Sequence, residues 1–374
     1  MGKKIGWLIV VLFLATSLFY FIRQKQHPSE PTSMVSTRTP STTVIPQETA
    51  PPNKVSTSIF VPAWAIDQAN LKLGSYDRVI YFGITAATKG INKYDQGYQN
   101  LTAFAKATAD KEKYLALTMT NSETNNAVLV DNKAQQKIIS QTIDIAKQNG
   151  FFGLVLDFEL FSLFNDKVPG EINQFVQSFY NQAKGSNLKF TVTIYGDTFY
   201  RKRPYDLKTI GQNCDEIMIM AYDFSKSGGE PGPNFPLAGR EKFGYDLKTM
   251  IDDFSSLVPK NKLTVIFGMY GYDWIVDSNR HPIKPAQSLS DQKIQQQYLS
   301  QCSSKNCVVL HDPQTKETEV DFVHYLGLDQ NNFAQEETHV VWFEDQNSAA
   351  AKQDYLKKQG ITSYSYWAYD YFQS

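Results

Sequence analysis

The chain has 374 residues and a formal net charge of −1, with 37 basic and 38 acidic side chains. This balance argues against a nucleic-acid-binding protein, which normally carries a basic excess or a basic stripe. Aromatic residues make up 13% of the chain, a content that suits a large core and also suits clefts in which sugar rings stack.

The amino terminus predicts a membrane anchor. The run from Ile5 to Ile22 carries no charge, is preceded by Lys3 and Lys4, and is followed by Arg23. About 18 apolar residues are long enough to cross a bilayer. No small-residue cleavage site follows Ala15, so we expect an uncleaved signal anchor over residues 1–26 rather than a removed signal peptide.

Residues 27–57 are dominated by proline, serine and threonine. Such a composition cannot bury enough apolar surface to fold, and proline keeps the chain extended. We therefore expect a tether that joins the anchor to a folded body over residues 58–374. This layout is typical of a single-pass membrane protein whose body lies outside the cytoplasm.

The cysteines and histidines predict no metal site. Cys302 and Cys307 are close enough in sequence to close a small loop in an oxidising compartment. Without further suitably spaced ligands they do not form a zinc site, and the five histidines are scattered. Cys214 is expected to be a buried thiol, and no cofactor is expected.

From Ser58 onward, apolar runs alternate with segments of helical period. Near-continuous apolar runs are typical of parallel strands that are covered on both faces. Eight such runs over about 315 residues favour a single (β/α)8 TIM barrel. A doubly wound open sheet is the alternative, but no G-x-G-x-x-G or P-loop sequence supports it. The predicted strands are Ser58–Ala65, Arg78–Thr85, Tyr114–Met119, Phe152–Glu159, Lys189–Tyr195, Glu216–Tyr222, Leu263–Tyr270 and Ser363–Ala368.

Helices are predicted between these strands, and one connection is too long to be simple. Residues from about Val276 to Val340 are polar with short apolar segments. We expect them to form a small α+β insertion before the last helix and strand. The main predicted helices are Asn132–Gln148, Gly170–Lys184, Tyr245–Leu257 and Ser348–Gln359.

The fourth predicted strand, FGLVLDFE, ends in two carboxylates. Because side chains alternate along a strand, Gly153, Val155, Asp157 and Glu159 share one face, and the intervening residues share the other. Burying two carboxylates costs several kcal/mol of folding free energy unless they are paired with other groups or serve a function. The simpler reading is a strand that emerges into solvent with hydrated acids.

In a barrel of this kind, chemistry takes place at the carboxyl ends of the strands. Acids, tyrosines and tryptophans gather at these ends, as a sugar site requires. No G-x-S-x-G elbow suggests a serine hydrolase. The residues at the predicted strand ends are Trp64, Thr118, Asn121, Asp157, Glu159, Tyr195, Asp197, Tyr222, Asp223, Tyr270 and Trp367.

Three motifs resemble glycoside hydrolase family 18, the chitinase family, in family order. FGLVLDFE resembles its D-G-x-D-x-D-x-E motif on strand 4, and Met220-Ala221-Tyr222-Asp223 resembles its M-x-Y-D motif on strand 6. Trp367 looks like the tryptophan at the floor of the family's sugar site. Segments around Asn121 and after Val340 are similar to the bacterial branch of spore-cortex-lytic N-acetylglucosaminidases. No LysM module is recognisable here.

The resemblance implies a retaining mechanism assisted by the substrate, an exception to the two-carboxylate scheme. Glu159 would act as general acid and then as base, while the substrate's own acetamido oxygen would be the nucleophile. Asp157 would hold the acetamido N–H, and Tyr222 its carbonyl group. The resemblance places Tyr195 and Asp223 against the sugar at the cleavage site, and Met220 and Trp367 at its floor. Trp64 and Tyr270, at other strand ends, complete the predicted substrate-binding set.

The sequence departs from the family motif at two positions. Phe152 and Val155 stand where the first two aspartates would be. Phe152 is expected to pack against the helices. Val155 shares the inward face with Asp157, which therefore lacks an acidic partner, so we expect an altered pH profile or a slower enzyme.

Three classes of function compete. The first is a membrane-anchored hydrolase of β-linked N-acetylglucosamine polymers, either peptidoglycan or chitin-like, acting as a monomer. The second is a surface lectin of the same fold that binds these glycans without cutting them. A solute-binding or scaffolding protein would leave the rim of acids and aromatics unexplained. Retention of Glu159, Asp157 and Tyr222 favours the enzyme, and the sequence leaves open whether cleavage is internal or at chain ends.

Overall fold

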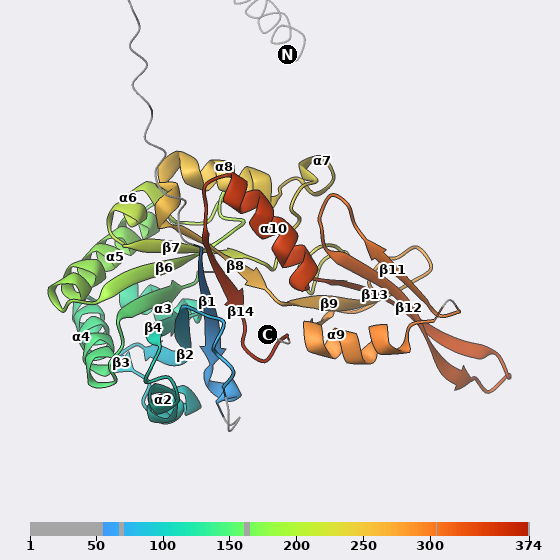
Figure 1. The fold of residues 1–374 in the computed structure, drawn as a ribbon, viewed down its shortest axis with the longest axis horizontal. Coiled ribbons are helices and arrows are strands. Elements are labelled where there is room, and N and C mark those ends of the chain that lie inside the picture. Colours follow the sequence, from blue (N-terminus) through green and yellow to red (C-terminus); the bar gives the residue numbers. More distant parts are fainter. Residues whose placement is uncertain (1–54, 67–70, 161–164, 304, 373–374) are drawn as a thin grey trace, which may run out of the picture. The chain divides into compact units, whose positions relative to one another are not determined.

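The computed structural model describes residues 55–66, 71–160, 165–303 and 305–372 (Figure 1). The predicted anchor, residues 1–26, and nearly all of the predicted tether lie outside these residues. Among the described helices, none combines the length and the apolar character that a membrane span requires. The anchor therefore remains a prediction from the sequence.

The body is a closed barrel of eight parallel strands, as predicted. Strand β1 pairs in parallel with both β14 and β2, which closes the sheet. A two-residue strand, β3 (Gly90–Ile91), pairs antiparallel with the end of β2. The barrel strands are β1 (Ser56–Pro62), β2 (Arg78–Ala87), β4 (Glu112–Met119), β5 (Gly153–Phe158), β6 (Lys189–Tyr195), β7 (Glu216–Ala221), β8 (Leu263–Gly268) and β14 (Ser363–Trp367).

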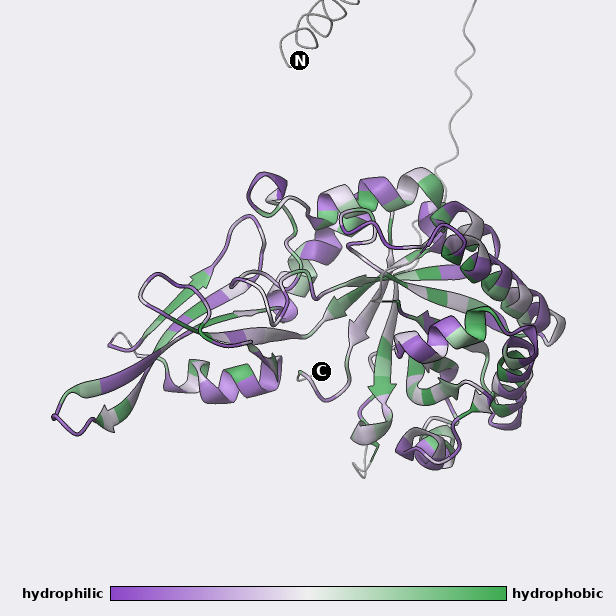
Figure 2. Cartoon of the chain, turned by 180° about the vertical axis from the view of Figure 1, so that it is seen from behind, coloured by the Kyte–Doolittle hydropathy of each residue, from purple (hydrophilic) through white to green (hydrophobic). Residues whose placement is uncertain are grey.

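Helices cover the outside of the barrel (Figure 1). Helix α4 shows why: Asp131 caps its first turn, and apolar residues such as Ile138 and Ile139 recur at helical spacing and are buried. The outer helices carry both hydrophilic and hydrophobic residues (Figure 2). These helices are α2 (Gln96–Ala107), α3 (Ser122–Leu129), α4 (Asn132–Gln148), α5 (Val168–Gly185), α6 (Leu207–Gln212), α8 (Leu247–Leu257) and α10 (Gln346–Lys358). The short helix α7 (Arg240–Phe243) buries none of its residues.

An antiparallel sheet with one helix is inserted between β8 and α10. Helix α9 (Asp291–Gln297) lies along this sheet (Figure 1). The strand order is β10-β9-β13-β12-β11. The strands are β9 (Tyr270–Val276), β10 (Gln287–Ser290), β11 (Cys307–His311), β12 (Thr318–Leu328) and β13 (Ala334–Phe343).

The insertion is wider than residues 276–340. The sequence predicted one strand over Leu263–Tyr270, but β8 ends at Gly268 and Tyr270 already opens β9. The apolar run continues through this boundary because both strands are buried there. Tyr270 and the residues that follow it therefore belong to the insertion and lie at the rim of the barrel.

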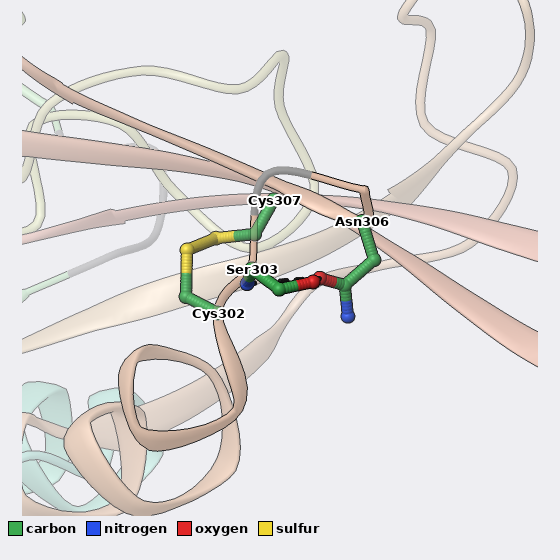
Figure 3. Close-up of a disulfide and its surroundings, with 4 residues drawn as sticks. All are labelled: Cys302, Ser303, Asn306 and Cys307. Atoms are coloured by element: carbon green, nitrogen blue, oxygen red, sulfur yellow. Dashed lines mark hydrogen bonds between the residues drawn. A yellow bond between two sulfur atoms is a disulfide. The ribbon is translucent and has the colours of Figure 1, made fainter.

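Cys302 and Cys307 form a disulfide that closes a short loop before β11 (Figure 3). Within the loop, Ser303 donates hydrogen bonds to Asn306 Oδ1 from its backbone N–H and its hydroxyl, at 3.0 and 2.6 Å. Cys214 is a buried free thiol, and burial raises its pKa to about 12. This thiol is therefore protonated and unreactive at neutral pH.

Candidate active site

Strand β5 presents Asp157 to the inside of the barrel. Val155 belongs to a cluster in the barrel interior, whereas Leu154 and Leu156 pack into the core between strands and helices, as the alternation predicted. One expectation was wrong: Phe152 lies before the strand and is 61% exposed, so it does not pack against the helices. The strand begins only at Gly153.

The predicted acids lie in one pocket of about 180 Å³ at the carboxyl ends of the strands. Six of the nine predicted site residues line it, and three do not: Trp64, Tyr195 and Met220. Three aromatic or polar residues that the sequence did not single out, Phe60, Phe82 and Thr193, complete the wall. The full lining is Phe60, Phe82, Asp157, Glu159, Thr193, Tyr222, Asp223, Tyr270 and Trp367.

Asp157 is held by the neighbouring strand. Its side chain is 4% exposed, and its Oδ1 accepts a hydrogen bond from the Thr193 hydroxyl at 2.6 Å. Burial raises the pKa of Asp157, and the Thr193 hydrogen bond opposes part of this rise. Thr193 stands two residues before Tyr195 on β6, so it shares the inward face of the strand that pairs with β5.

Below the acids, the barrel interior is largely apolar. Val155 precedes Asp157 on the inward face and is fully buried, in a cluster that also contains Phe60, Ala116 and Met218. Met220 lies in the same cluster and is 4% exposed, so it supports the pocket from below rather than lining it. Thr193 from β6 is thus the hydrogen-bond partner of Asp157 where the family motif would supply a second aspartate.

Replacing Val155 with Asp is expected to reduce the free energy of unfolding by about 3–5 kcal/mol, the usual cost of an uncompensated buried charge. The new carboxylate would face the negative charge of Asp157 within this apolar layer. Val155→Thr, which has the same shape and no charge, is the control. Urea denaturation of both variants tests the prediction, and equal midpoints would contradict it.

Glu159 follows β5 directly and has a raised pKa. Burial is the larger cause, and the nearby negative charge of Asp157 adds to it. The Tyr195 hydroxyl donates a 2.6 Å hydrogen bond to Glu159 Oε2 and lowers this pKa in part. The Arg203 guanidinium lies 3.6 Å from the centre of the Tyr195 ring and fixes its orientation. Tyr195 therefore contacts the proposed acid.

Replacing Tyr195 with Phe removes this donor and is expected to raise the pKa of Glu159. Because a hydrogen bond to a charged acceptor contributes about 1.5 kcal/mol, the basic limb of the pH–rate profile should move up by about one unit. Tyr205→Phe is a matched control, since the Tyr205 hydroxyl donates to the backbone oxygen of Phe158. An unchanged basic limb in Tyr195→Phe would show that the hydrogen bond does not tune the acid.

Tyr222 and Asp223 come from the end of β7. The Tyr222 hydroxyl lines the pocket and has no hydrogen-bond partner within the described part of the chain. Asp223 Oδ1 accepts hydrogen bonds from the hydroxyls of Tyr270 and Tyr272, the latter at 2.7 Å. Tyr272, which the sequence did not single out, and Tyr270 thus attach the insertion to the site.

The aromatic wall centres on Trp367. Its ring lies 4.6 Å from that of Phe82 in an edge-to-face arrangement and 5.6 Å from that of Phe60. Trp64 lies edge-on at 6.4 Å and is 53% exposed, so it lies at the mouth of the pocket. These rings offer an apolar surface of the kind on which sugar faces stack.

Two other residues at strand ends have structural partners. Asp197 is buried and forms ion pairs with Arg201 and Arg203, which lowers its pKa despite burial. Asn121 caps helix α3 by accepting a hydrogen bond from the backbone N–H of Thr124 at 2.8 Å. Neither residue lines the pocket.

The family model described as "Glycosyl hydrolases family 18" matches residues 37–371. The chain belongs to this family. It is 23% identical over 280 residues to the cortical fragment-lytic enzyme of Bacillus subtilis, a match that covers 71% of this chain and 59% of that enzyme. The chain spans little more than half the length of the curated relatives it matches.

Solved structures share the fold of this family 18 chain. The Bacillus cereus spore cortex-lytic enzyme SleL matches with a TM-score of 0.66 and 20% identity, over 84% of this chain and 71% of that chain. A family 18 chitinase from Cycas revoluta, solved with (GlcNAc)3, matches with a TM-score of 0.68 and 18% identity, over 84% and 95% of the two chains. The predicted family of glycoside hydrolases is thus confirmed, and the relatives that the chain matches include cortical fragment-lytic enzymes.

Proposed function

We propose that this family 18 glycoside hydrolase cleaves β-linked N-acetylglucosamine glycans with retention of configuration, and that the substrate supplies the nucleophile. One observation carries the proposal. The pocket combines the buried Asp157 and the half-buried Glu159 with the Tyr222 hydroxyl, which has no partner among the described residues, under an aromatic wall. A glycan-binding protein needs the wall but has no use for a carboxyl group whose pKa is raised.

The acids have separate roles because their surroundings differ. Glu159 keeps its proton near neutral pH, since burial and the charge of Asp157 raise its pKa. It gives this proton to the glycosidic oxygen as the bond to the anomeric carbon breaks. The acetamido carbonyl oxygen of the same sugar then bonds to that carbon and forms an oxazolinium ring.

Asp157 and Tyr222 hold this acetamido group. Asp157 accepts a hydrogen bond from the amide N–H and stabilises the positive charge of the ring. The hydrogen bond from Thr193 holds the Asp157 carboxylate in place. Tyr222 donates to the acetamido oxygen and keeps it below the anomeric carbon. Glu159, now deprotonated, takes a proton from water, whose oxygen opens the ring and restores the acetamido group. Every proton is thus returned, and no cofactor enters the cycle.

Peptidoglycan is the substrate we propose, because the chain is similar to enzymes that are named for the lysis of cortical fragments. The disulfide and the sequence of residues 1–57 support a membrane-anchored enzyme outside the cytoplasm, where disulfides persist.

Protease added to intact cells should then digest the barrel but not a cytoplasmic marker protein. Protection of the barrel would contradict this location.

The full-length chain should be incubated with purified peptidoglycan and, separately, with a fluorogenic N-acetylglucosamine oligomer. Release of new reducing ends from peptidoglycan supports the proposed substrate. Turnover of the oligomer alone would support a chitin-like substrate instead. Tight binding of both glycans without turnover at any pH would contradict the enzyme and favour a lectin.

A further inference from the structure

A second cluster of ligand-type side chains lies on the inserted sheet. His324 on β12 lies directly opposite Glu337 on β13, and His339 follows two residues later on the same face. One ligand atom from each residue lies within 4.8 Å of the others. The chain separates the histidines, so only the pairing of β12 with β13 brings them together.

His339 is oriented as metal-binding histidines are. Its side chain is 7% exposed, and its Nδ1 lies 2.8 Å from Asp273 Oδ1 on β9. The second oxygen of Asp273 accepts a hydrogen bond from the Tyr298 hydroxyl at 2.6 Å. With the Nδ1–H donating its hydrogen bond to this carboxylate, Nε2 keeps its lone pair.

This Nε2 atom is buried and, among the residues that the structure describes, has no hydrogen-bond partner. It lies 3.9 Å from Glu337 Oε2. A buried polar atom without a partner costs about 1–3 kcal/mol, so its persistence requires a reason. A bound cation between His339, Glu337 and His324 would supply one.

We propose that His324, Glu337 and His339 bind a zinc ion, with Asp273 as the positioning residue of His339. Two imidazole nitrogens and one carboxylate oxygen suit zinc, whereas magnesium and calcium prefer oxygen ligands alone. Ligands about 2.0–2.1 Å from a tetrahedral zinc ion are about 3.4 Å apart, so the cluster closes with a small movement of the exposed His324 side chain. Three protein ligands leave one position for water or an external ligand.

The ion lies away from the catalytic pocket. Asp273 and Tyr272 are adjacent on β9 and therefore point to opposite faces of the sheet, and Tyr272 is the residue that contacts Asp223. Zinc joins β12 to β13 and, through His339 and Asp273, both to β9. Binding is expected to stabilise the insertion without changing turnover of a soluble oligomer.

The test uses the untagged full-length chain after treatment with EDTA. Competition with a chromophoric chelator should show one zinc ion per chain, and Co²⁺ should give the d–d absorption of a tetrahedral site with nitrogen ligands. His324→Ala and Glu337→Gln should each weaken zinc binding by more than about 100-fold. Asp273→Asn should weaken it by about 10- to 100-fold, the usual effect of removing the partner of a ligand histidine.

Matched controls remove the same chemical groups elsewhere. His281→Ala removes an exposed imidazole, and Glu336→Gln removes the neighbouring exposed carboxylate from the other face of β13. Both should bind zinc as the unsubstituted chain does, and metal-free melting curves check that every variant folds. Absence of stoichiometric binding, or equal affinity in His324→Ala and His281→Ala, would overturn the proposal.

Discussion

Glu159→Gln is expected to lower kcat/KM for an N-acetylglucosamine oligomer by about 10²- to 10⁴-fold, the usual contribution of a general acid. The amide has the shape of the carboxyl group and can still accept the hydrogen bond from Tyr195. It cannot release a proton to the glycosidic oxygen. Steady-state kinetics should therefore show the loss in kcat, while oligomer binding, measured by calorimetry, remains.

Glu123→Gln is the control for this prediction, because Glu123 is exposed in the first turn of α3. The pH dependence gives an independent check. Since the pKa of Glu159 is raised, the basic limb of kcat/KM should lie well above the pH at which an ordinary glutamate loses its proton. A loss below tenfold in Glu159→Gln, or a basic limb near pH 4–5, would exclude Glu159 as the acid.

Lys352→Met is expected to reduce the free energy of unfolding by about 3–5 kcal/mol, because it leaves two buried carboxylates without their cation. Lys352 on α10 is 0% exposed and lies 2.7 Å from Glu317 and 2.7 Å from Glu344. Burial raises the pKa of Glu344, and the positive charge of Lys352 opposes this rise. Urea denaturation of the full-length chain measures the effect.

This ion cluster also supports the active site. Glu317 accepts hydrogen bonds from the backbone N–H groups of Asn234 and Phe235, and Asn234 Oδ1 accepts one from the Asp223 N–H at 2.8 Å. Lys352→Met should therefore also impair oligomer binding. Lys358→Met removes an exposed lysine from the same helix as a control. Equal denaturation midpoints for the two variants would mean that the buried cluster contributes no stability.

Local patterns in the sequence predict most of the barrel, because each strand is an apolar run and each helix has its own period. They also place Asp157 and Glu159 on one face. Local patterns do not predict the hydrogen-bond partners of these acids. Thr193 and Tyr195 reach them only because β5 pairs with β6. Alternation on β6 could have identified Thr193, since it shares a face with Tyr195.

Other features depend on contacts between distant segments. The periodicity of the sequence does not reveal the boundary between β8 and β9, because both strands are buried and therefore apolar. Tyr272 belongs to the site only because β9 returns to the rim and reaches Asp223. The histidines of the inserted sheet looked scattered because their proximity depends on the register of β12 and β13. The alternating E-x-H of Glu337 and His339 was the available signal.

The configuration of the first product tests the proposed mechanism most directly. Proton NMR spectra recorded early in the hydrolysis of an N-acetylglucosamine oligomer by the full-length chain distinguish the two anomers before they interconvert. Attack by the acetamido oxygen followed by water inverts the anomeric carbon twice, so the β anomer should form first. Initial formation of the α anomer, or no product at any pH, would contradict the mechanism assigned to Glu159, Asp157 and Tyr222.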